Sequence, residues 1–437
     1  VKEVTDELQD LAGKIKEYLE ILASRDRILA IISEELAEVK DLFAVPRRTE
    51  ITDWSGDMDD EDLIEREDMV VTITQGGYIK RTPLVDFRAQ KRGGKGVAGG
   101  SLKDDDVVTS LFVANTHTPL LVFTTSGMVY KLKTWRLPLG SRSSRGKAIV
   151  NILPIEIGTG IAAVMPVDRD EDHWDELQIV FATSAGDVRR NALSDFTNVM
   201  RNGKIAMKLP EGGDVSLVNA RICSEDDDVM LVTDSGRAIR FPTTDVRVFK
   251  GRDSTGVRGI RLTGTDRVVS MSVIRHFEAT ADERAAYLKL RRAMAGLTDE
   301  IEADEDDDEA SSGTVEIDYP AMSAAEDLIL TITASGSGKL SSSHDYPVRG
   351  RGGMGVAAMD KAMRGGPVVA SFPVEKGDQI MLATSKGQSI RVPVDGISFR
   401  SRSAGGVKVF NTGKGEVVVS VAYIADPADD EDAGEAS

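Results

Sequence analysis

The sequence predicts a mainly β protein, a six-bladed, propeller-like array of four-stranded blades that follows a short α-helical segment. Three observations lead to this prediction. The hydrophobic periodicity is helical before about residue 44 and alternates after about residue 69. A unit made of a β-run, a glycine-containing turn and a second β-run then recurs six times. The recurrence has a period of about 50 residues, which is typical of propeller blades.

The helical segment is predicted over residues 1–48. Apolar residues recur at helical spacing over 8–22 and again over 28–43. Ser24 interrupts the pattern and is a candidate cap for a second helix, which Pro46 ends. The two apolar stripes imply an apolar partner, either within the chain or across a dimer.

Acidic residues are concentrated outside the repeats. Residues 49–68 are expected to form an acidic linker, 277–327 an acidic and partly helical insert, and 426–437 an acidic, disordered tail. The formal net charge is −18, yet 69–276 and 328–423 together contain 41 basic and 29 acidic residues. A basic body of this kind binds polyanions by releasing counterions. The acidic segments either stay solvated or compete with a polyanion for the basic surface.

The repeat region is predicted to span 69–425. Each turn is expected to place a glycine where the backbone needs a positive φ. These turn glycines are Gly77, Gly127, Gly186, Gly236, Gly336 and Gly387. Their spacings are 50, 59, 50, 100 and 51 residues, and the longest interval contains the insert. The insert begins with a helical pattern over about 280–295, continues as the acidic run 302–309, and is expected to project from the fourth blade.

A basic, glycine-containing loop occupies the same place in every unit. In the first unit it reads Gln90-Lys-Arg-Gly-Gly-Lys-Gly96. The candidate phosphate-contacting residues of the other five units are Arg142, Arg145, Lys147, Arg201, Lys204, Arg252, Arg258, Arg349, Arg351, Arg400, Arg402 and Lys408. If the units are arranged radially, these loops lie on one circumference and form a basic rim. Such a rim can bend a duplex around its edge.

Other kinds of site are disfavoured. The G-x-G-x-x-G matches at 94–99 and 350–355 do not predict a dinucleotide site, because strand-like rather than helical sequence follows each. Their glycines are expected to allow close backbone approach to phosphate. No nucleophile–base pair recurs, and a single cysteine, Cys223, with four scattered histidines excludes cysteine-rich and most histidine-built metal sites. Aromatic residues make up 5% of the chain, which disfavours single-strand binding by base stacking.

The sequence also bears on location. No apolar run approaches the length of a membrane span, and the charged N-terminus does not resemble a signal peptide. The chain begins with Val1, so we expect a fragment or a processed chain. We expect a reducing, cytoplasmic setting and no membrane partner.

The first basic loop resembles the signature box of the DNA gyrase A family, Gln-Arg-Arg-Gly-Gly-Lys-Gly, with Lys91 where the family pattern has arginine. This difference keeps the charge and loses the two-pronged geometry of a guanidinium. The six repeats resemble that family's C-terminal β-pinwheel, a propeller-like disc whose blades exchange strands. Residues 22–29, 34–36 and 46–51 resemble the junction between the family's coiled-coil arm and this domain. The resemblance therefore covers nearly the whole chain.

The resemblance implies that the chain binds duplex DNA and wraps it around the rim with positive writhe, so that the gyrase complex introduces negative supercoils by ATP-dependent strand passage. It implies a DNA-binding site formed by Gln90, Lys91, Arg92, Gly93, Gly94, Lys95 and Gly96. It implies no catalytic residue, metal or cofactor on this chain. ATP and Mg²⁺ would act elsewhere in an A2B2 complex, which also contains gyrase B and the remainder of gyrase A. It also implies a bacterial, cytoplasmic, chromosome-associated location.

Alternatives stay open. The C-terminal domain of the topoisomerase IV A protein is a related pinwheel that generally lacks the box and has fewer intact blades. A propeller can also be a protein-interaction scaffold, and the fold alone does not exclude this function. A scaffold, however, does not need basic loops in register. A propeller enzyme would need convergent polar residues, of which the sequence gives no sign.

Overall fold

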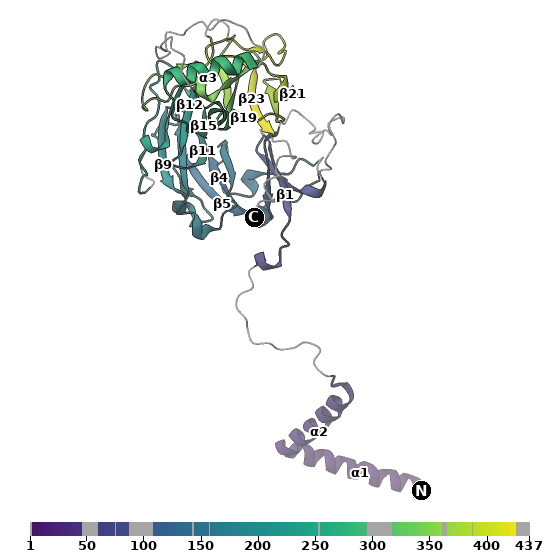
Figure 1. Cartoon of the computed structure of the whole chain (residues 1–437). Coiled ribbons are helices and arrows are strands. Elements are labelled where there is room, and N and C mark those ends of the chain that lie inside the picture. The colour runs from purple at the N-terminus through teal and green to yellow at the C-terminus, as the bar shows by residue number, and fades with distance from the viewer. Residues whose placement is uncertain are drawn as a thin grey trace. The chain divides into compact units, whose positions relative to one another are not determined.

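The structure is a computed structural model that divides into two compact units, residues 1–59 and 60–437 (Figure 1). It describes residues 2–45, 60–74, 76–86, 108–141, 144–156, 158–251, 254–294, 317–360, 365–386 and 388–424. The predicted linker, the acidic run of the insert and the tail fall largely or wholly outside these ranges.

The first unit consists of two helices, α1 (Lys2–Ala23) and α2 (Arg25–Phe43). The hydroxyl of Ser24 accepts the backbone N–H of Arg27, so this residue caps α2 as the sequence indicates. Neither helix contains a buried residue. The apolar stripe of α1, for example Leu11 at 54% and Leu22 at 73% exposure, has no apolar cover among the described residues.

The second unit is an array of six antiparallel sheets, as the repeats predict (Figure 1). From the inner to the outer strand, the first blade contains β3 (Val108–Asn115), β1 (Asp68–Thr74), β2 (Tyr78–Pro83) and β6 (Lys147–Ala148), and the second contains β7 (Ile161–Pro166), β4 (Pro119–Thr124), β5 (Met128–Lys133) and β10 (Lys204–Ile205). The third contains β11 (Leu217–Cys223), β8 (Gln178–Thr183), β9 (Asp187–Ala192) and β14 (Val257–Arg258), and the fourth contains β15 (Val268–Arg275), β12 (Asp227–Thr233), β13 (Arg237–Pro242) and β18 (Val356–Ala357). The fifth contains β19 (Val368–Val374), β16 (Leu328–Thr333), β17 (Ser337–Ser342) and β22 (Val407–Lys408), and the sixth contains β23 (Val418–Ile424), β20 (Gln379–Thr384) and β21 (Ser389–Pro393). The inner strand of the last blade, β23, lies against that of the first, β3, which closes the ring.

The outermost strand of each four-stranded sheet comes from the following repeat. Strand β6, for example, lies between β5 and β7 in the chain but pairs with β2 of the preceding blade. The sixth sheet has three strands in the part of the chain that the structure describes. Residues 87–107, which occupy the corresponding place in the first repeat, lie outside that part. The blades are therefore joined to one another by exchanged edge strands.

The predicted turn glycines have the expected backbone conformation. In each of the first five blades this glycine lies in the turn between the two central strands, for example β1 and β2, and its φ angle is between 75° and 85°. In the second blade the N–H of Gly127 donates to the carbonyl of Thr124, and the Thr124 hydroxyl accepts the N–H of Met128. Gly387 lies outside the described residues.

The hydrophobic core lies between neighbouring blades. All six residues of β4 are buried, because both faces of a blade pack against other blades. Phe123 of β4 meets Phe181 of β8 and Phe196 edge to face, with ring centroids 5.6 to 6.2 Å apart. These contacts fix the second blade against the third.

The insert contains the predicted helix, α3 (Ala281–Met294), and a second short one, α4 (Tyr319–Ala324). These two helices pack against the fifth blade. We expected the insert to project from the fourth blade, and for residues 295–316, which lie outside the described residues, this stays a prediction. Tyr287 and Leu288 of α3 form a buried cluster with Met322 of α4, and α3 lies against the 3₁₀ turn Ser343–Asp345 of the fifth blade. The buried apolar residues of these helices thus pack against each other and against the disc, while Met294 at the end of α3 is exposed.

His344 anchors the insert to the fifth blade. Its ring is 2% exposed, its Nε2 lies 2.8 Å from the carbonyl of Met322, and it meets Phe277 and Tyr287 edge to face. Burial lowers the pKa of His344 from its usual value. The imidazole is therefore neutral at pH 7 and donates its Nε2 hydrogen to the α4 carbonyl.

This burial predicts a pH dependence of stability. The unfolded chain takes up a proton at His344 before the folded chain does, so the stabilisation is complete above the unfolded pKa of about 6.5 and is lost as the pH falls below it. We expect the denaturant midpoint to fall more steeply between about pH 7 and pH 5 in the parent chain than in His344→Gln, whose amide does not titrate. Parallel pH profiles for the two chains would contradict this account.

Candidate nucleic-acid interface

Five segments carry the predicted basic loops to the outer edge of the disc. Each starts at the 3₁₀ turn that follows the second strand of a hairpin, for example β5, and ends in the short strand that pairs with the preceding blade. We call them crossing segments; they are residues 134–148, 193–205, 243–258, 343–357 and 394–408. Because the exchanged strand is the outermost strand of its sheet, the basic loops lie at the edge, as a radial arrangement requires.

Glycine lets each crossing segment approach the strand beneath it. A Cβ on Gly146 would lie 2.5 Å from the carbonyl oxygen of Ile79, and one on Gly355 would lie 2.5 Å from that of Ala238. Both glycines also have positive φ, 85° and 71°. We expected the glycines of 350–355 to allow close approach to phosphate. At Gly355 the structure provides a different reason, which is close approach to the preceding blade.

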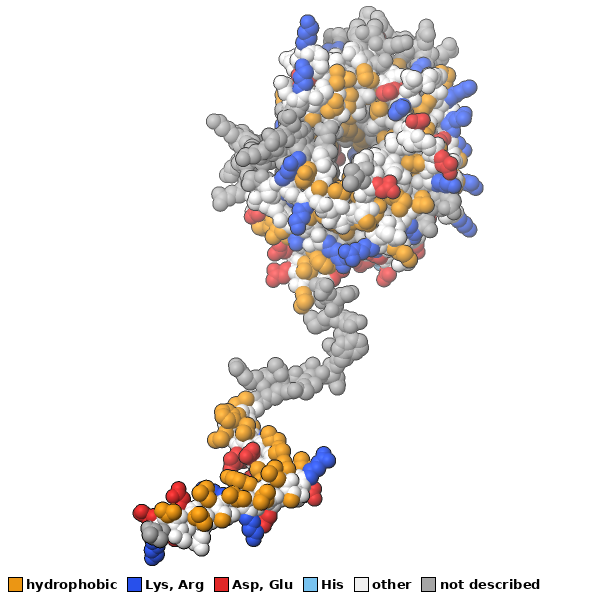
Figure 2. Space-filling model, turned by 180° about the vertical axis from the view of Figure 1, so that it is seen from behind, with side chains coloured by type: hydrophobic (Ala, Val, Ile, Leu, Met, Phe, Trp, Pro, Cys, Tyr) orange, Lys and Arg blue, Asp and Glu red, His pale blue; other side chains and the backbone are white. Residues whose placement is uncertain are grey.

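Most of the predicted cations are at the surface. The exposed ones are Arg145, Lys147, Arg201, Arg258, Arg349, Arg351, Arg400 and Lys408. Figure 2 shows Lys and Arg side chains gathered along the edge of the 60–437 unit. Lys204 is half-buried, and its Nζ donates to the carbonyls of Asp195 and Asn198 at 2.8 and 2.9 Å. Arg142, Arg252 and the whole of 90–96 lie outside the described residues.

The predicted role of Arg402 in contacting DNA is wrong. The sequence placed it among the DNA-contacting residues, but it is 1% exposed. Its Nε donates to the carbonyl of Asp345 and its Nη1 to the carbonyl of Ala357. A guanidinium held in this way positions the crossing segment and does not face a ligand at the surface. Sequence alone does not distinguish it from Arg400, which is two residues earlier and exposed.

Three buried cations that sequence reasoning missed hold the crossing segments from beneath. The Nζ of Lys80 donates to the carbonyls of Ser141 and Ser144 at 3.0 and 2.7 Å. The guanidinium of Arg189 donates to the carbonyls of Gly251 and Ser254. The Nζ of Lys339 donates to the carbonyls of Ser401, Arg402 and Ala404.

These cations share one position, the third residue after the turn glycine, in blades 1, 3 and 5. Blades 2 and 4 have Tyr130 and Ile239 there. The signal that could have identified them is a charged residue at a position whose neighbours in the β-run predict burial. Lys339 is fully buried, and burial lowers its pKa to about 7.

Replacement of Lys339 tests this arrangement. We expect Lys339→Met to lower the free energy of unfolding by about 2–3 kcal/mol, because buried carbonyls of the crossing segment lose their donor. Ile239→Met, at the equivalent position of the fourth blade, should cost less than about 1.5 kcal/mol, because it conserves volume and polarity. Urea titration of both variants measures the difference, and equal costs would show that the ammonium contributes nothing specific.

The described residues of the edge offer exposed cations and backbone groups. Within the described ranges, no group of three or more His, Cys, Asp or Glu side chains is placed to hold a metal ion. Of the helices that the structure describes, none is both long and apolar enough to cross a membrane. Regularly spaced exposed cations are suited to phosphate, which requires charge and no specific side-chain shape.

The structure is therefore a closed propeller of six blades that exchange strands, and its outer edge carries exposed cations. The family model described as "DNA gyrase C-terminal domain, beta-propeller" matches six stretches, residues 68–115, 118–154, 178–224, 227–275, 327–372 and 378–425. The chain belongs to this family. The six matched stretches coincide with the six repeats that the turn glycines define.

Similar proteins agree with this assignment. The chain is 46% identical over 99% of its length to the gyrase A protein of Granulibacter bethesdensis and 44% identical over 97% to that of Rickettsia bellii. It spans about half the length of these relatives, 47% of each. A crystal structure of the C-terminal domain of DNA topoisomerase IV matches 82% of this chain and 94% of its own with a TM-score of 0.59, and a DNA gyrase A C-terminal domain matches 82% and 100% with 0.56. At 22% and 20% identity, these two structures show the fold alone.

Proposed function

We propose that this chain binds duplex DNA along the outer edge of the disc and wraps it with positive writhe, so that a gyrase complex introduces negative supercoils by ATP-dependent strand passage. The observation that carries the proposal is the placement of the crossing segments. Each of the five brings exposed cations to the same edge of a closed ring. A duplex that follows successive blades must bend.

The energetics favour this reading. Smooth bending of a 20–30 bp duplex by 40–90° costs of order 1–6 kcal/mol. Each phosphate neutralised by Lys or Arg releases condensed counterions. Because exposed cations recur on successive crossing segments, a bent duplex meets more of them than a straight one, and the additional contacts offset the cost of bending.

The remaining roles follow from the family. We propose that the box at 90–96, which lies outside the described residues, is the first DNA-contacting element. The exposed apolar faces of α1 and α2 support contact with the remainder of a gyrase A protein. That protein would act with gyrase B in an A2B2 complex in the bacterial cytoplasm, bound to the chromosome, and ATP and Mg²⁺ would be used there rather than on this chain.

The alternatives are less well supported. The two curated relatives named above are gyrase A proteins, which favours gyrase over topoisomerase IV. The Lys91 substitution leaves the box otherwise intact, and topoisomerase IV generally lacks the box. A protein-interaction scaffold does not account for cations at the same edge of successive blades.

Binding to a short linear duplex at several salt concentrations tests the proposal. We expect log Kd to change steeply with log salt, by at least about 0.9 for each phosphate contacted. Arg258→Glu, on a crossing segment, should weaken binding far more than Arg169→Glu, which makes the same charge change at an exposed site between β7 and β8. Absence of binding, or equal weakening by the two variants, would overturn the edge as the DNA site.

A further inference from the structure

Arg351 links two neighbouring crossing segments. It belongs to segment 343–357, which starts after β17 of the fifth blade and ends in β18, paired with the fourth blade. We name each crossing segment by the blade with which its short strand pairs. Its Nε donates to the carbonyl of Asp245 at 3.0 Å and its Nη1 to the carbonyl of Arg258 at 3.1 Å. Both acceptors belong to the segment on the third blade. They stand at its two ends, the last residue of its 3₁₀ turn and the last residue of its short strand.

Arg402 repeats this arrangement one blade further on. Its Nε donates to the carbonyl of Asp345 at 3.0 Å and its Nη1 to the carbonyl of Ala357 at 2.6 Å. Asp345 ends the 3₁₀ turn of the segment on the fourth blade, and Ala357 ends its short strand. The same two guanidinium nitrogens therefore contact the same two backbone positions in two successive repeats.

The two arginines occupy one position of the repeat, fifteen residues after the turn glycines Gly336 and Gly387. The third repeat has Arg201 there, which is exposed and donates no hydrogen bond among the described residues. The fourth repeat has Gly251. The link thus joins the segments on blades 3, 4 and 5, and the described residues show no such link between the segments on blades 1, 2 and 3.

We propose that Arg351 and Arg402 are positioning residues that hold successive crossing segments at a fixed spacing and so set the curvature of the DNA path, while Arg349 and Arg400, two residues earlier, contact phosphate. This inference rests on the proposed function. The carbonyl acceptors engage Nε and Nη1 of each arginine and so hold both guanidinium groups against the neighbouring segment, and Arg402 is also buried. Arg349 and Arg400 are exposed on the same segments.

Backbone contacts close to Arg351 strengthen the link. The N–H of Gly352 donates to the carbonyl of Gly259 at 2.6 Å, and the N–H of Arg261 donates to the carbonyl of Gly353 at 2.8 Å. At the next junction, the N–H of Arg402 donates to the Asp345 carboxylate at 2.7 Å, which also lies 3.7 Å from Arg292 of α3. The insert therefore braces the same junction that Arg402 spans.

The test keeps the charge and removes the two-pronged contact. In Arg351→Lys/Arg402→Lys the ammonium cannot reproduce the planar fork. We expect affinity for a short linear duplex, and its salt dependence, to stay within about twofold of the parent chain, while the linking-number shift per bound protein falls by at least about half. Arg349→Ala/Arg400→Ala should instead weaken binding and reduce the salt slope by about one unit per arginine.

Two outcomes would overturn the inference. One is an unchanged linking-number shift in the lysine variant; the other is a loss of affinity equal to that of the alanine variant. Because Arg351 is exposed, Arg351→Lys alone should fold, and faster amide hydrogen exchange at Gly352 and Arg261 is the structural readout. If the parent chain does not shift the linking number, the proposed function fails, and unchanged exchange at these amides then independently overturns the positioning role.

Discussion

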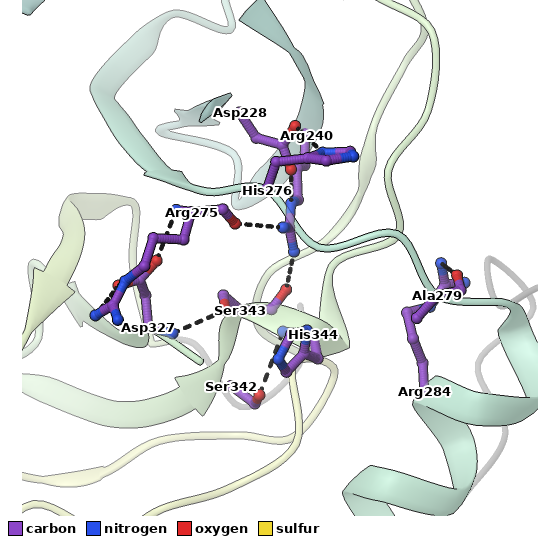
Figure 3. Close-up of polar contacts among 10 residues, drawn as sticks. All are labelled: Asp228, Arg240, Arg275, His276, Ala279, Arg284, Asp327, Ser342, Ser343 and His344. Carbon is purple, nitrogen blue, oxygen red and sulfur yellow. Dashed lines mark hydrogen bonds and ion pairs between the residues drawn. The ribbon is translucent and has the colours of Figure 1, made fainter. Parts of the chain in front are cut away.

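Asp228→Ala should lower the free energy of unfolding by about 3–5 kcal/mol, the cost typical of leaving a buried charge unpaired. Asp228 is fully buried and lies 2.6 Å from Nε of Arg240, which is 2% exposed (Figure 3). Arg240 also donates to the carbonyls of Ser343 and Arg275, so it ties the fourth blade to the fifth. The alanine leaves this guanidinium in the core without its counter-charge. Urea denaturation of the 437-residue chain measures the loss.

Two comparisons test the buried pair, whose Asp228 carboxylate also lies 2.8 Å from Nδ1 of His276. Asp228→Leu/Arg240→Met removes both charges and should recover most of the lost stability. Arg169→Ala breaks an ion pair with Glu176 in which both side chains are 59% exposed, and should cost less than about 1 kcal/mol. A cost for Asp228→Ala no larger than for Arg169→Ala would show that the pair does not stabilise the blade junction.

Replacement of Lys91, Arg92 and Lys95 by alanine should abolish topological wrapping while leaving most of the DNA affinity. The other blades still present exposed cations, so phosphate contacts persist when the three in the box are removed. The resemblance of 90–96 to the gyrase A box is the basis for a role beyond charge. Plasmid topology and duplex affinity, measured on the same preparation, separate the two properties.

A charge-matched variant provides the control for this prediction. Lys147→Ala/Arg258→Ala/Lys408→Ala removes three exposed cations from three other crossing segments. It should weaken binding and keep the shift in linking number per bound protein. Equal loss of wrapping in the two triple variants would mean that the box acts only through its charge.

The repeats could be predicted because their signals are local. A turn glycine and two β-runs of alternating hydrophobicity define each hairpin without reference to the rest of the chain. The exchanged strands could not be derived from the residues in this way. Lys147–Ala148, for example, is two residues long, has no periodicity, and pairs with a strand about seventy positions earlier. Only the family resemblance implied the exchange.

The roles of individual cations at the edge were also beyond local rules. Arg400 and Arg402 read alike in the sequence, but one is exposed and the other is enclosed by carbonyls of the neighbouring segment. Lys339 reads as a surface lysine, yet it is buried because the crossing segment of the next repeat covers it. Burial at these positions is decided by contacts between repeats, and these depend on the closed ring.

The central claim is that the edge of this disc wraps DNA. The most direct measurement is the linking number of a relaxed plasmid that topoisomerase I or ligase closes in the presence of increasing amounts of the chain. We predict positive superhelical shifts that grow in proportion to the bound protein. Saturating binding with no shift in linking number would contradict the claim, because it would mean that the basic edge holds DNA without wrapping it.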